Sequence, residues 1–257
     1  MKGFRSGYID ERAVVGEGAI LGDGVTVGAF AVVYDGVTLG DGSFVGPHSI
    51  LGEPPGDYYD RADTAPDGCN IGAGSVIRSH TVIYDGVTAG PGLSTGHRVT
   101  IREGSRLGKD CRVGTMSDLQ GDLTVGDHVR MHSSVHIGQL STVESFVWIF
   151  PFVVLTNDPH PPSDTCTQGP TIRQFAVLAT NSVIMPGIEV GAHALVGAMS
   201  LVTRDVLPHR IAAGSPARDV GAVESVRCKE GRLDPVYPWP AHFRRGYSDG
   251  AFEFDDD

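Results

Sequence analysis

Large aliphatic residues recur at every sixth position along most of this chain. One run of hexads extends from Val15 to Leu51, a second from Ile71 to Leu155, and a third, in a shifted register, from Ile172 to Val202. The fifth residue of each complete hexad is small or apolar and is never charged. An α-helix would place apolar residues three and four apart, and a long strand would alternate them. The period of six therefore predicts short strands joined by tight turns.

Each hexad is expected to supply one strand whose aliphatic residue points inward, with the fifth residue at the following corner. Successive coils would pair through parallel backbone bonds at about 4.8 Å per coil, so that each layer contacts only its neighbours. We predict an all-β parallel β-helix over residues 1–218, with extruded loops at 52–70 and 157–171. The first loop carries Tyr58, Tyr59 and Arg61. Residues 219–257 lose the period and are expected to form an irregular tail with one short helix and a disordered acidic end.

Composition agrees with a thin core, because Gly accounts for 35 of 257 residues and aromatic residues for only 7%. The net charge of -11 argues against nucleic acid or an anionic membrane as a partner. No stretch has the length and apolar character of a membrane span or a signal peptide, so we expect a cytoplasmic protein. The four cysteines form no C-x-x-C pair and are expected to be free thiols. They are Cys69, Cys111, Cys166 and Cys228.

The repeat resembles that of the hexapeptide-repeat acyltransferases, and the resemblance covers roughly residues 13–218. It implies a left-handed prism with three hexads per coil and a homotrimer with active sites at the subunit boundaries. The segments TNDPHPP and AVLATNSVIMPGIEVG look most like those of bacterial transferases that N-acylate nucleotide-linked amino sugars. The implied reaction is transfer of an acetyl group to an amine. Acetyl-CoA, or another short acyl-CoA, would be the co-substrate, and no cofactor would be tightly bound.

Residues 197–218, GAMSLVTRDVLPHRIAAGSPAR, resemble the end of the family's prism, where coenzyme A lies in a groove between adjacent prisms. By this resemblance, the expected cofactor contacts are Ala179, Ala198, Arg204 and Arg218. An arginine suits the ribose phosphate because its guanidinium donates two parallel hydrogen bonds.

The second loop, NDPHPPSDTCTQGPT, is rich in proline and therefore stiff. In the resembled family, a loop at this place reaches a neighbouring subunit, which makes Asn157, Asp158 and His160 candidates for acceptor binding. Just before the loop, three aromatic residues fall on outward positions, where water would make them costly. These residues, Trp148, Phe150 and Phe152, predict a subunit contact.

Ten histidines compete for a catalytic role. Four of them occupy the fourth hexad position, a turn site, and are expected to be solvated: His48, His80, His128 and His193. His209 and His242 lie outside the repeat and suggest no partner. His97 has the strongest case, because Ala89 and Thr95, the two first positions without a large aliphatic residue, lie in the hexads around it. Local rule-breaking of this kind tends to mark functional places.

We predict that His97 is the general base, since an imidazole, with an ordinary pKa near 6.5, can take a proton from an alkylammonium acceptor at neutral pH. Two coils beyond His97 the chain reaches Ser133, so His136 is expected about 10 Å along the same edge. It would assist catalysis or bind the acceptor. A backbone N–H beside Gly96 or Gly114 would stabilise the oxyanion.

Three other functions stay open. The spacing of His128, His132 and His136 suggests a zinc-dependent hydrolyase like the prism-shaped γ-carbonic anhydrases, although the family's ligand spacing differs. A hydroxyl in place of an amine would make the protein an O-acetyltransferase. A nonenzymatic scaffold would bind neither metal nor coenzyme A.

Overall fold

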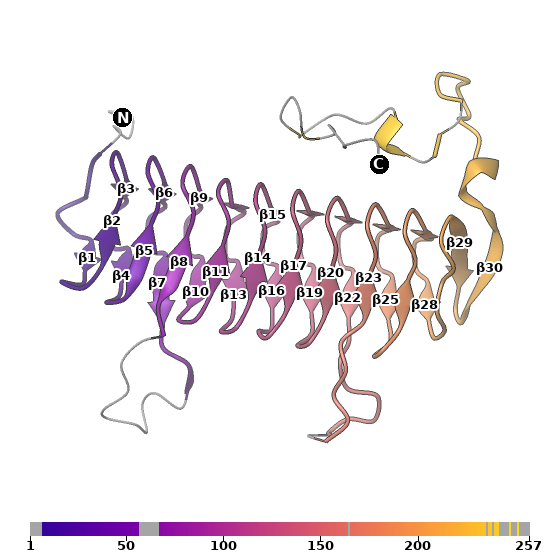
Figure 1. The fold of residues 1–257 in the computed structure, drawn as a ribbon, viewed down its shortest axis with the longest axis horizontal. Helices are drawn as coiled ribbons and strands as arrows, with labels where there is room; N and C mark the ends of the chain where they lie inside the picture. Colours follow the sequence, from indigo (N-terminus) through magenta and orange to yellow (C-terminus); the bar gives the residue numbers. More distant parts are fainter. Residues whose placement is uncertain are drawn as a thin grey trace, which may run out of the picture.

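The computed structural model describes residues 7–56, 67–163, 165–234, 236–237, 239–241, 247 and 251. It is an elongated three-sided prism from which two loops project on one side (Figure 1). Four residues singled out in the sequence lie outside the described residues: Tyr58, Tyr59, Arg61 and His242. None of the helices within the described residues has the length and apolar character that crossing a membrane requires.

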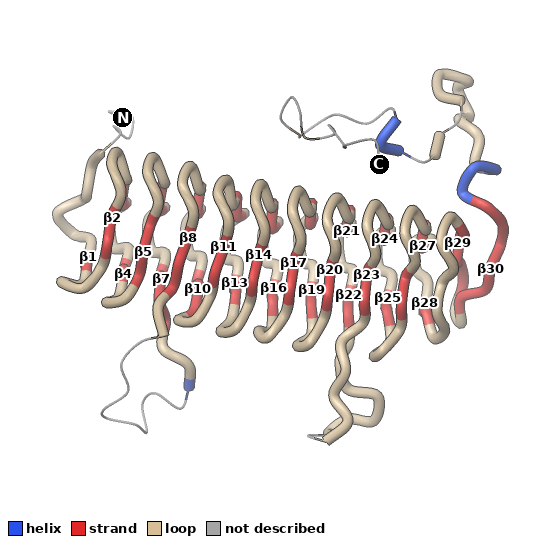
Figure 2. The backbone as a smooth tube through the Cα atoms, in the orientation of Figure 1, coloured by secondary structure: helices blue, strands red, loops and turns tan. Residues whose placement is uncertain are grey.

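The hexads form short strands that wind into three sheets, and every third strand joins the same sheet (Figure 2). Sheet A contains β3 (Thr26–Val27), β6 (Phe44–Val45), β9 (Val76–Ile77), β12 (Ser94–Thr95), β15 (Arg112–Val113), β18 (Arg130–Met131), β21 (Trp148–Ile149), β24 (Val177–Leu178), β27 (Leu195–Val196), β29 (Arg210–Gly214) and β30 (Ala217–Ala222). Sheet B contains β1 (Val14–Val15), β4 (Val32–Val33), β7 (Ile50–Glu53), β10 (Val82–Tyr84), β13 (Thr100–Ile101), β16 (Asp118–Leu119), β19 (His136–Ile137), β22 (Val154–Leu155), β25 (Val183–Ile184) and β28 (Leu201–Val202). Sheet C contains β2 (Ile20–Leu21), β5 (Val37–Leu39), β8 (Cys69–Ile71), β11 (Thr88–Ala89), β14 (Arg106–Leu107), β17 (Thr124–Val125), β20 (Thr142–Val143), β23 (Thr171–Ile172) and β26 (Glu189–Val190).

All pairs between successive coils are parallel, and the register stacks each inward aliphatic residue on the next, as Ile101 on Leu119. Both side chains are fully buried. At several corners a buried hydroxyl is satisfied by its own turn, as where Ser75 Oγ donates to the Gly72 carbonyl at 2.6 Å. The all-β parallel β-helix predicted from the hexads is therefore confirmed.

The free thiols expected from the sequence are confirmed. Cys69 and Cys111 occupy fifth hexad positions and are buried, and this burial raises the pKa of each thiol to about 12. These two cysteines are therefore small core residues rather than nucleophiles.

At the corner between sheets C and A, the expectation that His128 is solvated is wrong. Residues at the fourth hexad position have positive φ, and where they carry rings these stack from one coil to the next, because a coil rise of about 4.8 Å brings the ring centroids within stacking range. His128 is buried, lies 4.8 Å from the ring of Phe146, and has Nδ1 3.0 Å from Asp110 Oδ2. His193 is half-buried between Phe175 and His209. At the corner between sheets A and B, His48 and His80 are exposed, as expected.

Part of the C-terminal segment packs against sheet A and covers aromatic residues that were expected to face a neighbouring subunit. Trp148 and Phe150 are half-buried beside the 3-10 helix η3 (Trp239–Ala241), which lies on the opposite side of the prism from the loops (Figure 1). Trp148 Nε1 donates to the hydroxyl of Tyr247. Trp148 and Phe150 therefore no longer support the inferred subunit contact. Phe152, the third residue of that prediction, is exposed.

The prism ends in an antiparallel hairpin of β29 and β30, followed by the short 3-10 helix η2 (Val223–Ser225). The boundary predicted at residue 218 lies inside β30. Both loops leave the corner between sheets B and C. The first is shorter than predicted, because β7 extends through Glu53 and β8 begins at Cys69.

Candidate functional site

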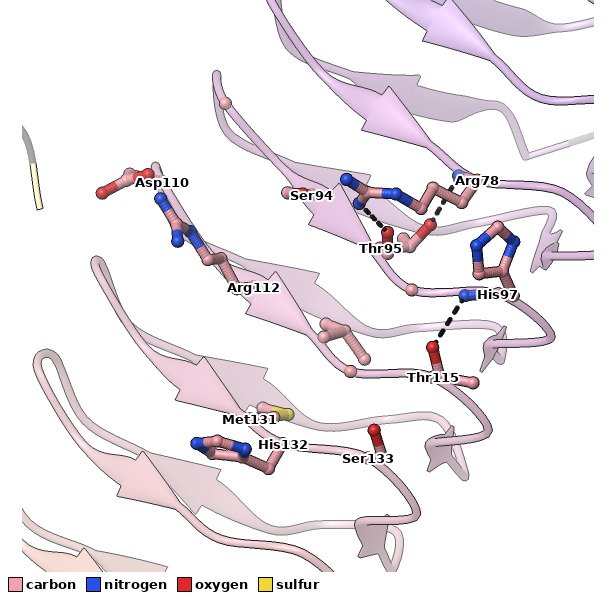
Figure 3. A pocket seen from close by; sticks show the side chains of 14 residues that line it. Arg78, Ser94, Thr95, His97, Asp110, Arg112, Thr115, Met131, His132 and Ser133 are labelled. Atoms are coloured by element: carbon pink, nitrogen blue, oxygen red, sulfur yellow. Dashed lines mark hydrogen bonds between the residues drawn. The ribbon is translucent and has the colours of Figure 1, made fainter. Parts of the chain in front are cut away.

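An open groove with a volume of about 710 Å³ crosses sheet A at β12, β15 and β18, from the corner with sheet C to the corner with sheet B. We call it the His97 groove (Figure 3). It is lined by Arg78, Gly92, Ser94, Thr95, Gly96, His97, Asp110, Arg112, Val113, Gly114, Thr115, Met131, His132 and Ser133. Its position halfway along the prism keeps it away from both loops.

His97 is exposed on the corner and is held from both sides. Its ring Nδ1 lies 2.8 Å from Ser79 Oγ, and its backbone N–H donates to Thr115 Oγ1 at 3.2 Å. Both contacts span 18 residues, which is one coil. If Nδ1 carries the proton and donates it to Ser79, the lone pair is on Nε2, so His97 can accept a proton at that atom.

Two positions on the floor of the groove are glycine because a Cβ would clash there in the backbone conformation that they adopt. A Cβ on Gly96 would lie 2.2 Å from the Thr115 nitrogen, and one on Gly114 would lie 2.3 Å from the His132 carbonyl carbon. Gly96 donates its N–H to the Val113 carbonyl at 2.7 Å, so the expectation that it stabilises an oxyanion is wrong. For the Gly114 N–H, the described residues show no such bond.

His136 does not lie on the same edge as His97, and this expectation is also wrong. It belongs to β19 on the outer face of sheet B, three residues past the corner that carries Ser133. Its Nδ1 lies 3.3 Å from Asp118 Oδ2, one coil earlier, and this contact is the main cause that holds the pKa of Asp118 below its usual value. His136 is not among the residues that line the groove.

The four expected cofactor contacts fall into two groups. Arg204 and Arg218 line a hollow of about 250 Å³ at the C-terminal end of the prism, beside the ion pair of Arg210 and Asp219. Ala179 and Ala198 lie elsewhere, in the turns that follow β24 and β27, on the same corner as His97. The structure therefore brings the two arginines together, and it leaves the two alanines outside their hollow.

The expected acceptor-binding residues lie on the second loop, which leaves a different corner from that of His97. The carboxylate of Asp158 accepts the backbone N–H of His160 at 3.0 Å and that of Ser163 at 2.7 Å. The Asn157 carbonyl accepts the backbone N–H of Gln168 at 2.8 Å. Within this chain, Asp158 thus organises its own loop and does not contribute to the His97 groove.

A family model, Bacterial transferase hexapeptide (six repeats), matches residues 18–53. The hexapeptide period of the sequence and the parallel β-helix of the structure agree with this match and continue beyond it. The chain is 34% identical to the serine acetyltransferase of Escherichia coli (strain K12) over 93 residues, which cover 36% of this chain and 33% of that enzyme. It is 29% identical to the acyl-[acyl-carrier-protein]–UDP-N-acetylglucosamine O-acyltransferase of Burkholderia lata over 163 residues, 63% of this chain and 56% of that enzyme. The chain thus spans a third to just over half of these curated relatives.

Among solved structures, the Arabidopsis UDP-N-acetylglucosamine acyltransferase superimposes with a TM-score of 0.60 over 84% of this chain and 74% of that one. The two are 18% identical, so this likeness concerns the fold alone. The named relatives of this hexapeptide-repeat protein are acyltransferases.

The three histidines of the zinc alternative lie apart in this hexapeptide-repeat protein. His128 is at the corner between sheets C and A, His132 at the next corner, and His136 on sheet B. In the part of the chain that the structure describes, no three His, Cys, Asp or Glu residues gather as a metal site would require.

Sequence reasoning missed five polar residues of the groove, and it named His132 only as a zinc ligand and Ser133 only as a position along the edge. The five are Arg78, Ser94, Asp110, Arg112 and Thr115. A signal for Arg78 and His132 was present. Arg78 and His132 follow the inward aliphatic residue of their hexads, a position that is Gly at the same corner in Gly46, Gly96 and Gly114. Steps of 18 residues, one coil, lead from Arg78 to Gly96, Gly114 and His132, so the spacing places them on one edge, and the structure shows that this edge borders a groove.

Proposed function

We propose that this hexapeptide-repeat protein is an acyl-CoA-dependent acyltransferase whose chemistry takes place in the His97 groove. The observation that carries the proposal is an exposed histidine with Nδ1 on Ser79, at the edge of a glycine-floored groove. Further support comes from the relatives, which are named as acyltransferases.

In the proposed reaction, His97 Nε2 takes a proton from the acceptor nucleophile as that atom attacks the thioester carbonyl carbon. The C=O electron pair moves to oxygen, and the resulting oxyanion accepts a hydrogen bond from the Gly114 N–H. When the C=O bond re-forms, the C–S bond breaks and its electron pair leaves on sulfur. The proton on His97 then passes to the coenzyme A thiolate, which restores the neutral imidazole.

We favour the amine of a nucleotide-linked amino sugar as the acceptor, on the resemblance of TNDPHPP and the segment that follows it. O-acyl transfer to a hydroxyl is the second candidate, and the name of the Burkholderia lata relative, an O-acyltransferase, favours it. The same base serves both, since either nucleophile must lose a proton.

The direct test measures thiol release from acyl-CoAs of increasing chain length, with nucleotide amino sugars and hydroxyl acceptors in parallel. Acceptor-dependent release with a short acyl-CoA is expected, and mass spectrometry of the product separates an amide from an ester. Absence of acceptor-dependent release, together with no binding of coenzyme A, would favour a scaffold instead.

We expect Arg204 and Arg218 to bind the phosphates of coenzyme A. Their hollow lies about five coils from His97, roughly 24 Å along the prism, which suits the two ends of an extended coenzyme. Changing either to Ala should raise the KM for acyl-CoA roughly tenfold, the loss of one charge-assisted hydrogen bond. Arg227→Ala, an exposed arginine outside the hollow, is the control. An effect confined to the KM for the acceptor would refute the assignment.

We also propose a homotrimer. Exposed apolar side chains occur in every second coil along the corner that carries His97, with Ser134 and Asn181 in the coils between them: Met116 is 59% exposed, Phe152 57% and Met199 69%. Water makes such a row costly, and a neighbouring prism would cover it and close the groove. Light scattering at micromolar concentration should give about three times the chain mass of 27.1 kDa. A stable monomer that still turns over would contradict a shared site.

A further inference from the structure

Arg78 stands at a corner position where the preceding and following coils have Gly46 and Gly96. Those two glycines donate their backbone N–H to the carbonyl of the next coil, to Ile77 and Val113 respectively, each at 2.7 Å. Arg78 breaks this pattern. Its backbone N–H donates to the hydroxyl of Thr95 at 3.0 Å, and its guanidinium NH1 donates to the Thr95 carbonyl at 2.9 Å.

Thr95 makes this exchange of bonds possible. It occupies an inward position that holds a large aliphatic residue in nearly all of the other coils, and it is 1% exposed. A buried hydroxyl is unfavourable unless it is hydrogen-bonded. Because the Thr95 hydroxyl accepts the Arg78 N–H, the Thr95 carbonyl is available to accept a bond from the guanidinium. This bond holds the guanidinium at the rim of the groove. The two hydrogen bonds that Thr95 accepts from Arg78 thus explain why position 95 holds a polar residue in place of an aliphatic one.

A second guanidinium, that of Arg112, belongs to the coil after that of Thr95 and therefore lies two coils beyond Arg78. Arg112 in β15 pairs with Ser94 in β12, the residue before Thr95, so the two arginines lie on either side of Ser94 (Figure 3). Both are exposed, and neither has an ion-pair partner among the described residues, whereas the neighbouring Arg130 is paired with Asp110. In a chain of net charge -11, this is a local concentration of positive charge.

Two hydroxyls of the groove can also donate hydrogen bonds, and Asp110, the one carboxylate among the lining residues, is engaged by Arg130 and His128. Thr115 Oγ1 accepts the N–H of His97, so its own proton stays available, and Ser133 adds a hydroxyl one coil further on. A groove of about 710 Å³ is large enough for a nucleotide-sized ligand. Two guanidiniums with flanking hydroxyls match an anion with several oxygens on two centres, which is the chemistry of a diphosphate.

We propose that Arg78, positioned by Thr95, and Arg112 form a subsite for the diphosphate of the acceptor within the His97 groove. The proposal rests on the proposed acyl transfer for its role and names the acceptor class as a nucleoside diphosphate derivative. It assigns the phosphates of coenzyme A to the other site, with Arg204 and Arg218.

The test is calorimetric titration with UDP, pyrophosphate, uridine and coenzyme A, without any acyl donor. Wild-type protein should bind UDP and pyrophosphate, and uridine far more weakly. Arg78→Ala and Arg112→Ala should each weaken UDP binding at least tenfold and change coenzyme A binding less than twofold. The matched control is Arg106→Ala, which removes an exposed arginine of the same coil as Arg112 on sheet C and should leave UDP binding unchanged.

The role of Thr95 is tested by a pair of variants of similar size. Thr95→Val loses the hydroxyl and should weaken UDP binding about fivefold, while Thr95→Ser keeps it and should bind as wild type does. The melting temperature of each variant separates this effect from misfolding.

Three results would overturn the subsite: no binding of UDP or pyrophosphate to wild type, equal UDP affinity of the Arg78→Ala and Arg106→Ala variants, or a loss confined to coenzyme A. Intact UDP binding without acyl transfer would instead overturn the proposed function and leave the subsite standing.

Discussion

Replacing His97 with Ala should lower kcat by about 10² to 10⁴, the usual contribution of a general base. The acceptor cannot attack the thioester efficiently until its proton is taken, and Nε2 of His97 is the atom we propose for this step. Coenzyme A affinity and the oligomeric state should stay as in wild type, because among the described residues the imidazole hydrogen-bonds only to Ser79, and the bond to Thr115 Oγ1 comes from the backbone N–H, which Ala keeps. Steady-state thiol release measures the effect.

His80→Ala is the matched control, since His80 is an exposed histidine at the same corner outside the groove. It should keep wild-type turnover. If His97→Ala retains more than about a tenth of wild-type kcat, His97 is not the base, and His132, which also lines the groove, becomes the next candidate.

Asp110→Asn should have the largest effect on stability, a loss of about 2 kcal/mol in the free energy of unfolding. Asp110 Oδ2 lies 2.6 Å from NH2 of the buried Arg130 and 3.0 Å from Nδ1 of His128. The guanidinium keeps its position 4.5 Å from the centre of the Tyr247 ring but loses the carboxylate that compensates its burial.

The chain has two tryptophans, Trp148 and Trp239, and both belong to the aromatic cluster beside Arg130. When unfolding in urea is followed by their fluorescence, the midpoint of the transition should lie at a lower urea concentration for Asp110→Asn than for wild type. Asp122→Asn is the control, because Asp122 also has positive φ at a corner but is exposed. Equal midpoints for the two variants would mean that the Asp110–Arg130 pair does not anchor the cluster.

The period of six sufficed to predict the strands, their inward residues and the loops, because each inward position is decided by burial alone. It also singled out Thr95, whose departure from the pattern the structure explains through Arg78. The placement of His136 failed because three residues past a corner the chain is already on another sheet. Counting in steps of 18 residues from His97 leads to Thr115 and Ser133, which do line the groove.

The covering of Trp148 by the C-terminal segment could not be predicted from the sequence. It depends on a contact between Trp148 and Tyr247, 99 residues apart, outside the repeat. For the same reason His128 was expected to be solvated: its hexad position marks a turn, but its burial comes from the stack on Phe146. Periodicity describes each coil and its neighbours, and it carries no information on a segment that returns along the prism.

A crystal structure with coenzyme A and a nucleotide amino sugar bound tests the central claim most directly. The account predicts the coenzyme's sulfur in the His97 groove and the acceptor nucleophile about 3 Å from His97 Nε2, directly or through one water. Coenzyme A bound with its sulfur on another face of the prism, and no acceptor atom within reach of His97, would contradict it.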